Sequence, residues 1–91
     1  PMRILALLER QIGQLYSAKI LDTSHTPRDA SSKALGISPY IYDRILRMSG
    51  RYTRERLSYL LDYSLDLEKR VKSGDLNETH ACDLLLSEMT R

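Results

Sequence analysis

Residues 35–74 read LGISPYIYDRILRMSGRYTRERLSYLLDYSLDLEKRVKSG, and they contain the start and stop signals of two consecutive helices. Ser38 can cap a helix, and Pro39 suits the first turn because the amide hydrogen that proline lacks would have no partner there. Thr53 offers a second cap, and Gly74 can adopt the left-handed conformation that often ends a helix. The stretch therefore predicts one helix over about 39–49 and a longer one between Thr53 and Gly74.

Apolar residues recur at helical spacing in both predicted helices. In the first they are Ile41, Ile45 and Met48, and in the second Leu57, Leu60, Leu61, Leu65 and Val71. Residues three or four positions apart lie on the same side of a helix. We therefore expect these two sides to pack against the rest of the chain.

The segments on either side of this stretch have helical patterns as well. Residues 2–22 place on one stripe Leu5, Leu8, Ile12, Leu15, Tyr16 and Lys19, widened by Leu7, Ala18 and Leu21. Thr26 can cap a short helix that ends near Gly36 and has the thin apolar face Ala30, Ala34 and Leu35. Asn77 can cap a last helix that holds Ala81, Leu84, Leu85 and Met89. With no alternating strand pattern, the sequence predicts an all-α fold, a five-helix bundle with one core.

Length and composition favour one small domain without a membrane segment. A chain of 91 residues buries about 60–65% of its unfolded surface, which suits one compact unit. Fourteen Lys and Arg against twelve Asp and Glu leave a net charge of +2, too balanced to require nucleic acid. The single Cys82 excludes a disulfide framework, and no apolar run reaches the roughly 18 residues of a membrane span. We expect residues 1–91 to form one soluble, cytoplasmic domain, cut from a longer chain.

The sequence offers little for catalysis or for a cofactor. His80 and Cys82 lie two positions apart on the predicted last helix, about 200° around its axis, so they cannot bind one metal ion together. Gly36, Gly50 and Gly74 are isolated and form no GxxxxGK loop for a nucleotide phosphate. We therefore predict no catalytic residue, no cofactor and no metal, and we do not expect this domain to be an enzyme.

A basic patch follows the turn at Gly36. Arg44, Arg47 and Arg51 have the spacing i, i+3 and i+7, and Arg54 and Arg56 follow. Three interpretations stay open: a solvated face paired with acids such as Asp43 and Glu55, a phosphate-binding face, and a protein interface. The candidate contact residues for a partner or for DNA are Tyr40, Arg44, Arg47, Arg51 and Arg54, with Gly74 and Asp75 in a solvent-facing loop as weaker candidates.

One acidic residue lies within an apolar stripe. Glu68 shares a side of its helix with Leu57, Leu61 and Ser64, where a carboxylate is costly unless it has a partner. Lys72 follows four positions later in the favourable orientation. We expect Glu68 and Lys72 to form a structural ion pair.

Residues 28–47, RDASSKALGISPYIYDRILR, resemble a bacterial helix-turn-helix. Ala30 would be the small residue of the first helix, Gly36 would form the turn, and Ile37 and Ile41 would be buried. In that arrangement the residues that meet the major groove or its phosphates would be Ser38, Tyr40, Arg44 and Arg47. A DNA-binding transcriptional regulator is therefore the alternative function.

Nearly the whole chain resembles the C-terminal domain of the delta subunit of DNA polymerase III, a part of the bacterial clamp loader. The resemblance covers the first helix, LLERQIGQLYSAKIL, the stretch 35–74, and the last helix, ACDLLLSEM. It depends on order and spacing: an LGI turn with proline three residues after its glycine, a polar entry after the basic helix, and an acid four residues before the lysine of KSG.

This resemblance implies a collar domain, a helical bundle that joins the delta subunit to gamma/tau-type and delta-prime subunits in a circular assembly. It implies that clamp opening, the ATPase-like fold and contact with the sliding clamp belong to N-terminal domains outside this sequence. The parent complex would be DNA polymerase III, a nucleotidyltransferase. The arginine patch would then lie at a subunit interface or near primer–template DNA during DNA replication.

Overall fold

The computed structural model describes residues 3–91, which form helices and no strand. The helices are α1 (Arg3–Thr23), α2 (Arg28–Leu35), α3 (Pro39–Ser49), α4 (Arg54–Lys72) and α5 (Glu78–Met89). The predicted all-α bundle of five helices is confirmed. The first helix was expected to begin at residue 2, which lies outside the described residues. None of the helices in the described part has the length and apolar character needed to cross a bilayer.

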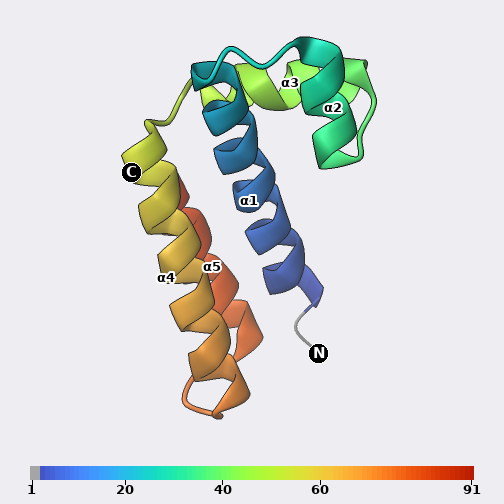
Figure 1. Cartoon of the computed structure of the whole chain (residues 1–91). Coiled ribbons are helices and arrows are strands. Elements are labelled where there is room, and N and C mark those ends of the chain that lie inside the picture. The colour runs from blue at the N-terminus through green and yellow to red at the C-terminus, as the bar shows by residue number, and fades with distance from the viewer. Residues whose placement is uncertain (1–2) are drawn as a thin grey trace.

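Three long helices make the body of the molecule, and two short helices cover one end of it (Figure 1). α1, α4 and α5 run alongside one another, while α2 and α3 lie together at the end where α1 finishes. The turn from α4 to α5 lies at the opposite end. The molecule is elongated as a result, with extents of 43 × 24 × 16 Å.

Side-chain caps fix the starts of three helices. The Ser38 hydroxyl accepts a hydrogen bond from the Ile41 amide at 3.2 Å, and Thr53 does the same for Arg56 at 3.0 Å. Asn77 Oδ1 accepts from the His80 amide at 2.7 Å. Each cap pairs an amide that the helix itself leaves without a partner, so the local sequence is enough to set these boundaries. The cap expected at Thr26 is wrong: α2 begins after Pro27 with no side-chain cap.

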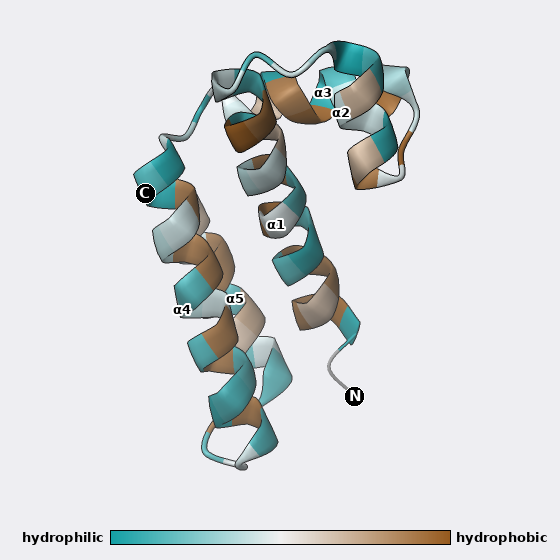
Figure 2. Cartoon of the chain, in the orientation of Figure 1, coloured by the Kyte–Doolittle hydropathy of each residue, from teal (hydrophilic) through white to brown (hydrophobic). Residues whose placement is uncertain are grey.

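The main core lies between α1, α4 and α5. Its buried members are Leu5 and Ile12 from α1, Leu60 and Leu67 from α4, and Ala81, Cys82 and Leu85 from α5. Brown and teal segments alternate along these helices in Figure 2, as they do in amphipathic helices that turn one side inward. Burial of this apolar surface is the main force that holds the three helices together.

Serine residues occupy close contacts between helices. Ser49 and Ser64 are fully buried, and each hydroxyl donates at 2.7 Å to a backbone carbonyl three residues earlier in its own helix. Ser31 and Ser32 are also buried in α2, where the predicted apolar residues Ala30 and Ala34 are exposed. A serine is small, and its hydroxyl can donate a hydrogen bond to a carbonyl of its own helix. It can therefore be buried where two helices meet.

Several predicted apolar faces are rotated relative to the observed ones. Leu7 and Leu65 are exposed, with 44% of Leu65 accessible, whereas Leu67 is fully buried. In α3 the predicted face is wrong in the same way: Ile41 is 38% exposed and Met48 40%, and Tyr42 with Ser49 points inward instead. The spacing was helical, but the neighbouring helices decide which side they cover.

Replacing Leu67 with Ala tests the observed rotation of α4. We expect Leu67→Ala to lower the free energy of unfolding by about 2–5 kcal/mol, because it opens a cavity among fully buried side chains. Leu65→Ala removes the same atoms from an exposed position and should change the free energy of unfolding by about 0.5 kcal/mol or less. Urea unfolding followed by circular dichroism measures both. Equal losses in the two variants would show that α4 is rotated differently.

Candidate functional site

The outward side of α3 carries the aromatic and basic residues that the sequence singles out. Tyr40 lies in the first turn, directly after the Ser38 cap and Pro39, and 65% of it is exposed. Arg44 and Arg47 follow at i+4 and i+7 and are exposed on the same side. Arg51 lies just beyond the helix and Arg54 begins α4, so the structure brings these five residues to one end of the molecule. We call Tyr40, Arg44, Arg47, Arg51 and Arg54 the α3 patch.

The arginines of the α3 patch form no close ion pair in the described part of the chain. Asp43, directly before Arg44 in sequence, is held by Arg28 of α2 through two hydrogen bonds of 2.9 and 2.8 Å. These bonds from Arg28 are the main cause that lowers the pKa of Asp43. The interpretation in which Asp43 pairs with the patch is therefore wrong.

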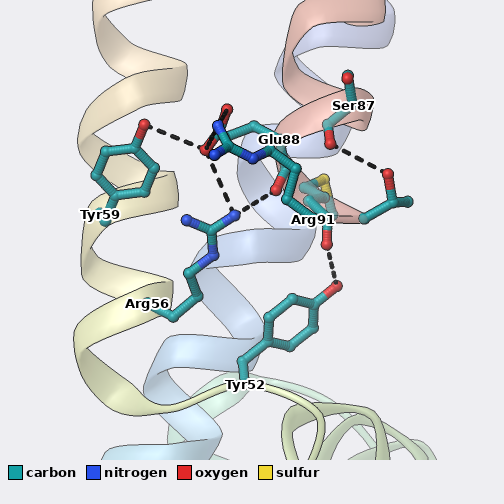
Figure 3. A network of polar contacts seen from close by, with 8 residues as sticks. Tyr52, Arg56, Tyr59, Ser87, Glu88 and Arg91 are labelled. Carbon is teal, nitrogen blue, oxygen red and sulfur yellow. Dashed lines mark hydrogen bonds and ion pairs between the residues drawn. The ribbon is translucent and has the colours of Figure 1, made fainter.

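Arg56 does not belong to the α3 patch, although the sequence places it only two residues after Arg54. It is partly buried and points toward α5, where its guanidinium donates to the Glu88 carbonyl and lies 3.4 Å from Glu88 Oε1 (Figure 3). The same carboxylate oxygen is 3.3 Å from the Tyr59 hydroxyl, and Glu88 Oε2 is 3.3 Å from Arg91. Glu88 thus connects α4 to the last turn of α5.

This polar network borders a hollow that also reaches Arg51 of the α3 patch. The hollow has a volume of about 530 Å³ and is lined by residues of the α3–α4 connection and by the end of α5, including Arg51, Tyr52 and Arg91. The network was not predicted, because Arg56 and Glu88 are 32 residues apart and no local spacing connects them. Arg56 and Arg91 of the network are already paired with Glu88, so the network holds α5 against α4.

Gly74 and Asp75 lie far from the α3 patch. They form the turn between α4 and α5, at the opposite end of the molecule from α3 (Figure 1). Gly74 has a φ of 85°, and the Asp75 carboxylate accepts a hydrogen bond from the Ser73 hydroxyl at 3.1 Å. The two residues therefore make a tight, exposed turn, and the structure does not join them to the other candidates.

Glu68 and Lys72 lie together as expected, and a second carboxylate is close by. Lys72 Nζ is 3.7 Å from Glu68 Oε2. Glu9 of α1 is partly buried, and its Oε1 is shielded from solvent with no hydrogen-bond partner in the described part of the chain. Burial raises the pKa of Glu9, the charge of Glu68 raises it further, and Lys72 acts in the opposite direction. Glu9 was not predicted, since its neighbours come from another helix.

The described residues include no group of three His, Cys, Asp or Glu side chains that could hold a metal ion. Cys82 is buried in the core, and burial raises the pKa of its thiol. A buried thiol with a raised pKa is a poor nucleophile and a poor metal ligand.

The packing expected of a helix-turn-helix is absent from α2 and α3. Ile41, which was expected to be buried, is 38% exposed, and Ala30 is exposed as well. Ile37 alone is partly buried. The prediction of a buried Ile41 is therefore wrong.

Comparison with models of protein families gives a match over residues 1–89 to the C-terminal domain of the DNA polymerase III delta subunit. No curated protein and no solved structure matches the chain significantly. The family model covers all five helices of the described structure.

The Glu9 carboxylate makes stability depend on pH. Because its folded pKa is raised, the folded chain binds this proton more tightly than the unfolded chain. The contribution of Glu9 to stability is therefore fully present below the ordinary glutamate value of 4.5 and is lost as pH rises through its folded pKa. We expect Glu9→Gln to raise the melting temperature at pH 7 and to lose this advantage on acidification. Asp66→Asn, at an exposed site, is the control, and identical pH profiles for Glu9→Gln and the native chain would contradict the effect.

Proposed function

The chain belongs to the family of C-terminal domains of the DNA polymerase III delta subunit, a clamp-loader subunit, and we propose that it joins this subunit to its neighbours in the complex. In this role the whole of residues 1–91 acts as one oligomerisation module, a collar domain. Its neighbours are gamma/tau-type and delta-prime subunits. Assembly by this module helps the clamp loader to place the sliding clamp during DNA replication.

The observation that supports this role is the chemistry of the α3 patch. Tyrosine and arginine are enriched among the residues that contribute most to protein interfaces. Here Tyr40 is largely exposed on a capped helix, and Arg44 and Arg47 stand beside it without ion-pair partners among residues 3–91. Two side chains with exposed guanidinium groups and an exposed phenol on one rigid helix suit a protein partner that supplies carboxylates and apolar surface.

Chemistry belongs to other parts of the complex in this proposal. Clamp opening and contact with the clamp are functions of the N-terminal domains, and nucleotidyl transfer is a function of the polymerase. This domain contributes binding surfaces held on a stable bundle. The arginines of the α3 patch lie at the subunit interface in this proposal, or alternatively near primer–template DNA, since arginine binds phosphate well.

A binding experiment tests this role against the regulator alternative. The chain is mixed with purified gamma/tau-type and delta-prime subunits from the same genome, and complexes are detected by sedimentation. We expect binding to these subunits, and no strong sequence preference in a parallel titration with duplex DNA. Tight, sequence-dependent binding to duplex DNA without affinity for the subunits would reverse the assignment.

Removing two arginines of the α3 patch should weaken assembly without unfolding the chain. We expect Arg44→Ala with Arg47→Ala to raise the dissociation constant for the partner subunits by about 10- to 100-fold. Helicity should stay unchanged because both side chains are exposed. Replacing Arg3 and Arg10 of α1 removes the same charge elsewhere and serves as the control. Loss of the far-ultraviolet dichroism in the double variant would instead make these arginines structural.

A further inference from the structure

A row of apolar side chains on α3 is left open by the rest of the chain. Ile41, Ile45 and Met48 have the spacing i, i+4 and i+7, so they lie on one side of the helix. The side that α3 turns toward the bundle carries Tyr42 and Ser49, both nearly inaccessible. Ile41 and Met48 remain more than a third exposed, and Ile45 is partly buried between the two sides. We call Ile41, Ile45 and Met48 the α3 row.

The α3 row has the length and spacing of a helix-packing surface. Side chains at i, i+4 and i+7 form a ridge along a helix, and such a ridge fits the groove of another helix laid against it. The row covers most of α3, which is 11 residues long and fixed at its start by Ser38. Brown ribbon is visible on α3 in Figure 2, although α3 lies at the end of the molecule. A partner helix can therefore lie along α3 without any rearrangement of the bundle.

Charge defines the partner further. Arg44 is three residues after Ile41 and four before Met48, so it stands beside the α3 row on the helix surface. Arg44 has no ion pair with residues 3–91, and Asp43 is already bound to Arg28. A helix that covers the row therefore has to present a carboxylate near Arg44, because a guanidinium covered without a partner is costly.

One side of α4 carries three acidic side chains and no aliphatic residue. Glu55, Tyr59, Asp62 and Asp66 are all exposed on α4 and recur at i, i+4, i+7 and i+11, so they lie on one side of it. The domain thus has a basic and apolar face on α3 and an acidic face on α4.

We propose that the α3 row, with Arg44 beside it, binds an amphipathic helix of the neighbouring clamp-loader subunit. That helix presents apolar residues every three or four positions and an Asp or Glu opposite Arg44. The inference rests on the proposed role in assembly and specifies the surface that performs it. Duplex DNA fits the row less well, since phosphates would pair with Arg44 but would leave Ile41 and Met48 without apolar contacts.

The experiment compares variants of the α3 row with a matched pair elsewhere. Ile41→Ser with Met48→Ser removes exposed apolar surface from the row. Leu65→Ser with Leu86→Ser removes a similar amount from α4 and α5, where these residues are 44% and 45% exposed. Arg44→Glu reverses the charge without touching any packed side chain. Each variant is titrated with purified gamma/tau-type and delta-prime subunits at low and high salt, and its fold is checked by circular dichroism.

We expect the row variant and Arg44→Glu each to weaken subunit binding by about tenfold or more, and the Leu65/Leu86 control to stay within about threefold. The effect of Arg44→Glu should shrink at high salt. If the row variant and Arg44→Glu both bind the subunits as tightly as the native chain does, the inference is overturned and the proposed function stays intact. No binding by the native chain would contradict the proposed function itself. The native chain could instead associate with itself, and the row variant could abolish this self-association. That result would assign the row to a second copy of the chain and overturn the inference.

Discussion

The packing of α1 against all four other helices is the constraint on which the structure depends. α1 has 21 residues and is therefore about 31 Å long, most of the 43 Å length of the molecule. Leu5 and Ile12, in its first half, enter the core with α4 and α5. Near its end Lys19 donates a hydrogen bond of 3.1 Å to the Ser49 carbonyl at the end of α3. One helix thus fixes both the core and the position of the α2–α3 pair.

This arrangement divides the helices between two tasks. The main core draws its buried residues from α1, α4 and α5, and Arg56 with Glu88 reinforces the contact of α4 with α5. α3 packs on α1 through the buried Tyr42 and Ser49, and five of its eleven residues, among them Tyr40, Ile41 and Met48, stay exposed. A helix that is anchored on one narrow side can present the others to a partner. The α3 patch and the α3 row are two parts of that remaining surface.

Features governed by neighbours in sequence could be predicted, and those governed by contacts across the fold could not. The caps at Ser38, Thr53 and Asn77 depend on a side chain and an amide three residues later, so the sequence predicted three helix starts correctly. The rotation of each helix depends on its neighbours, which is why Leu65 was expected inside and Leu67 was missed. The buried serines were not predicted, because serine is polar and its hydrogen bond to a carbonyl of its own helix is not visible in the sequence. Likewise, the α3 patch followed from spacing, whereas the pairing of Asp43 with Arg28 required the fold.

The central claim is that α1, α4 and α5 hold the domain while α3 stays available to a neighbouring subunit. Hydrogen–deuterium exchange, measured on the chain alone and in the reconstituted clamp loader, tests it most directly. The claim predicts that the amides of α3, residues 39–49, exchange more slowly in the complex, while the core amides of α4 around Leu60 and Leu67 change little. Unchanged exchange in α3, with new protection only on other helices, would contradict it.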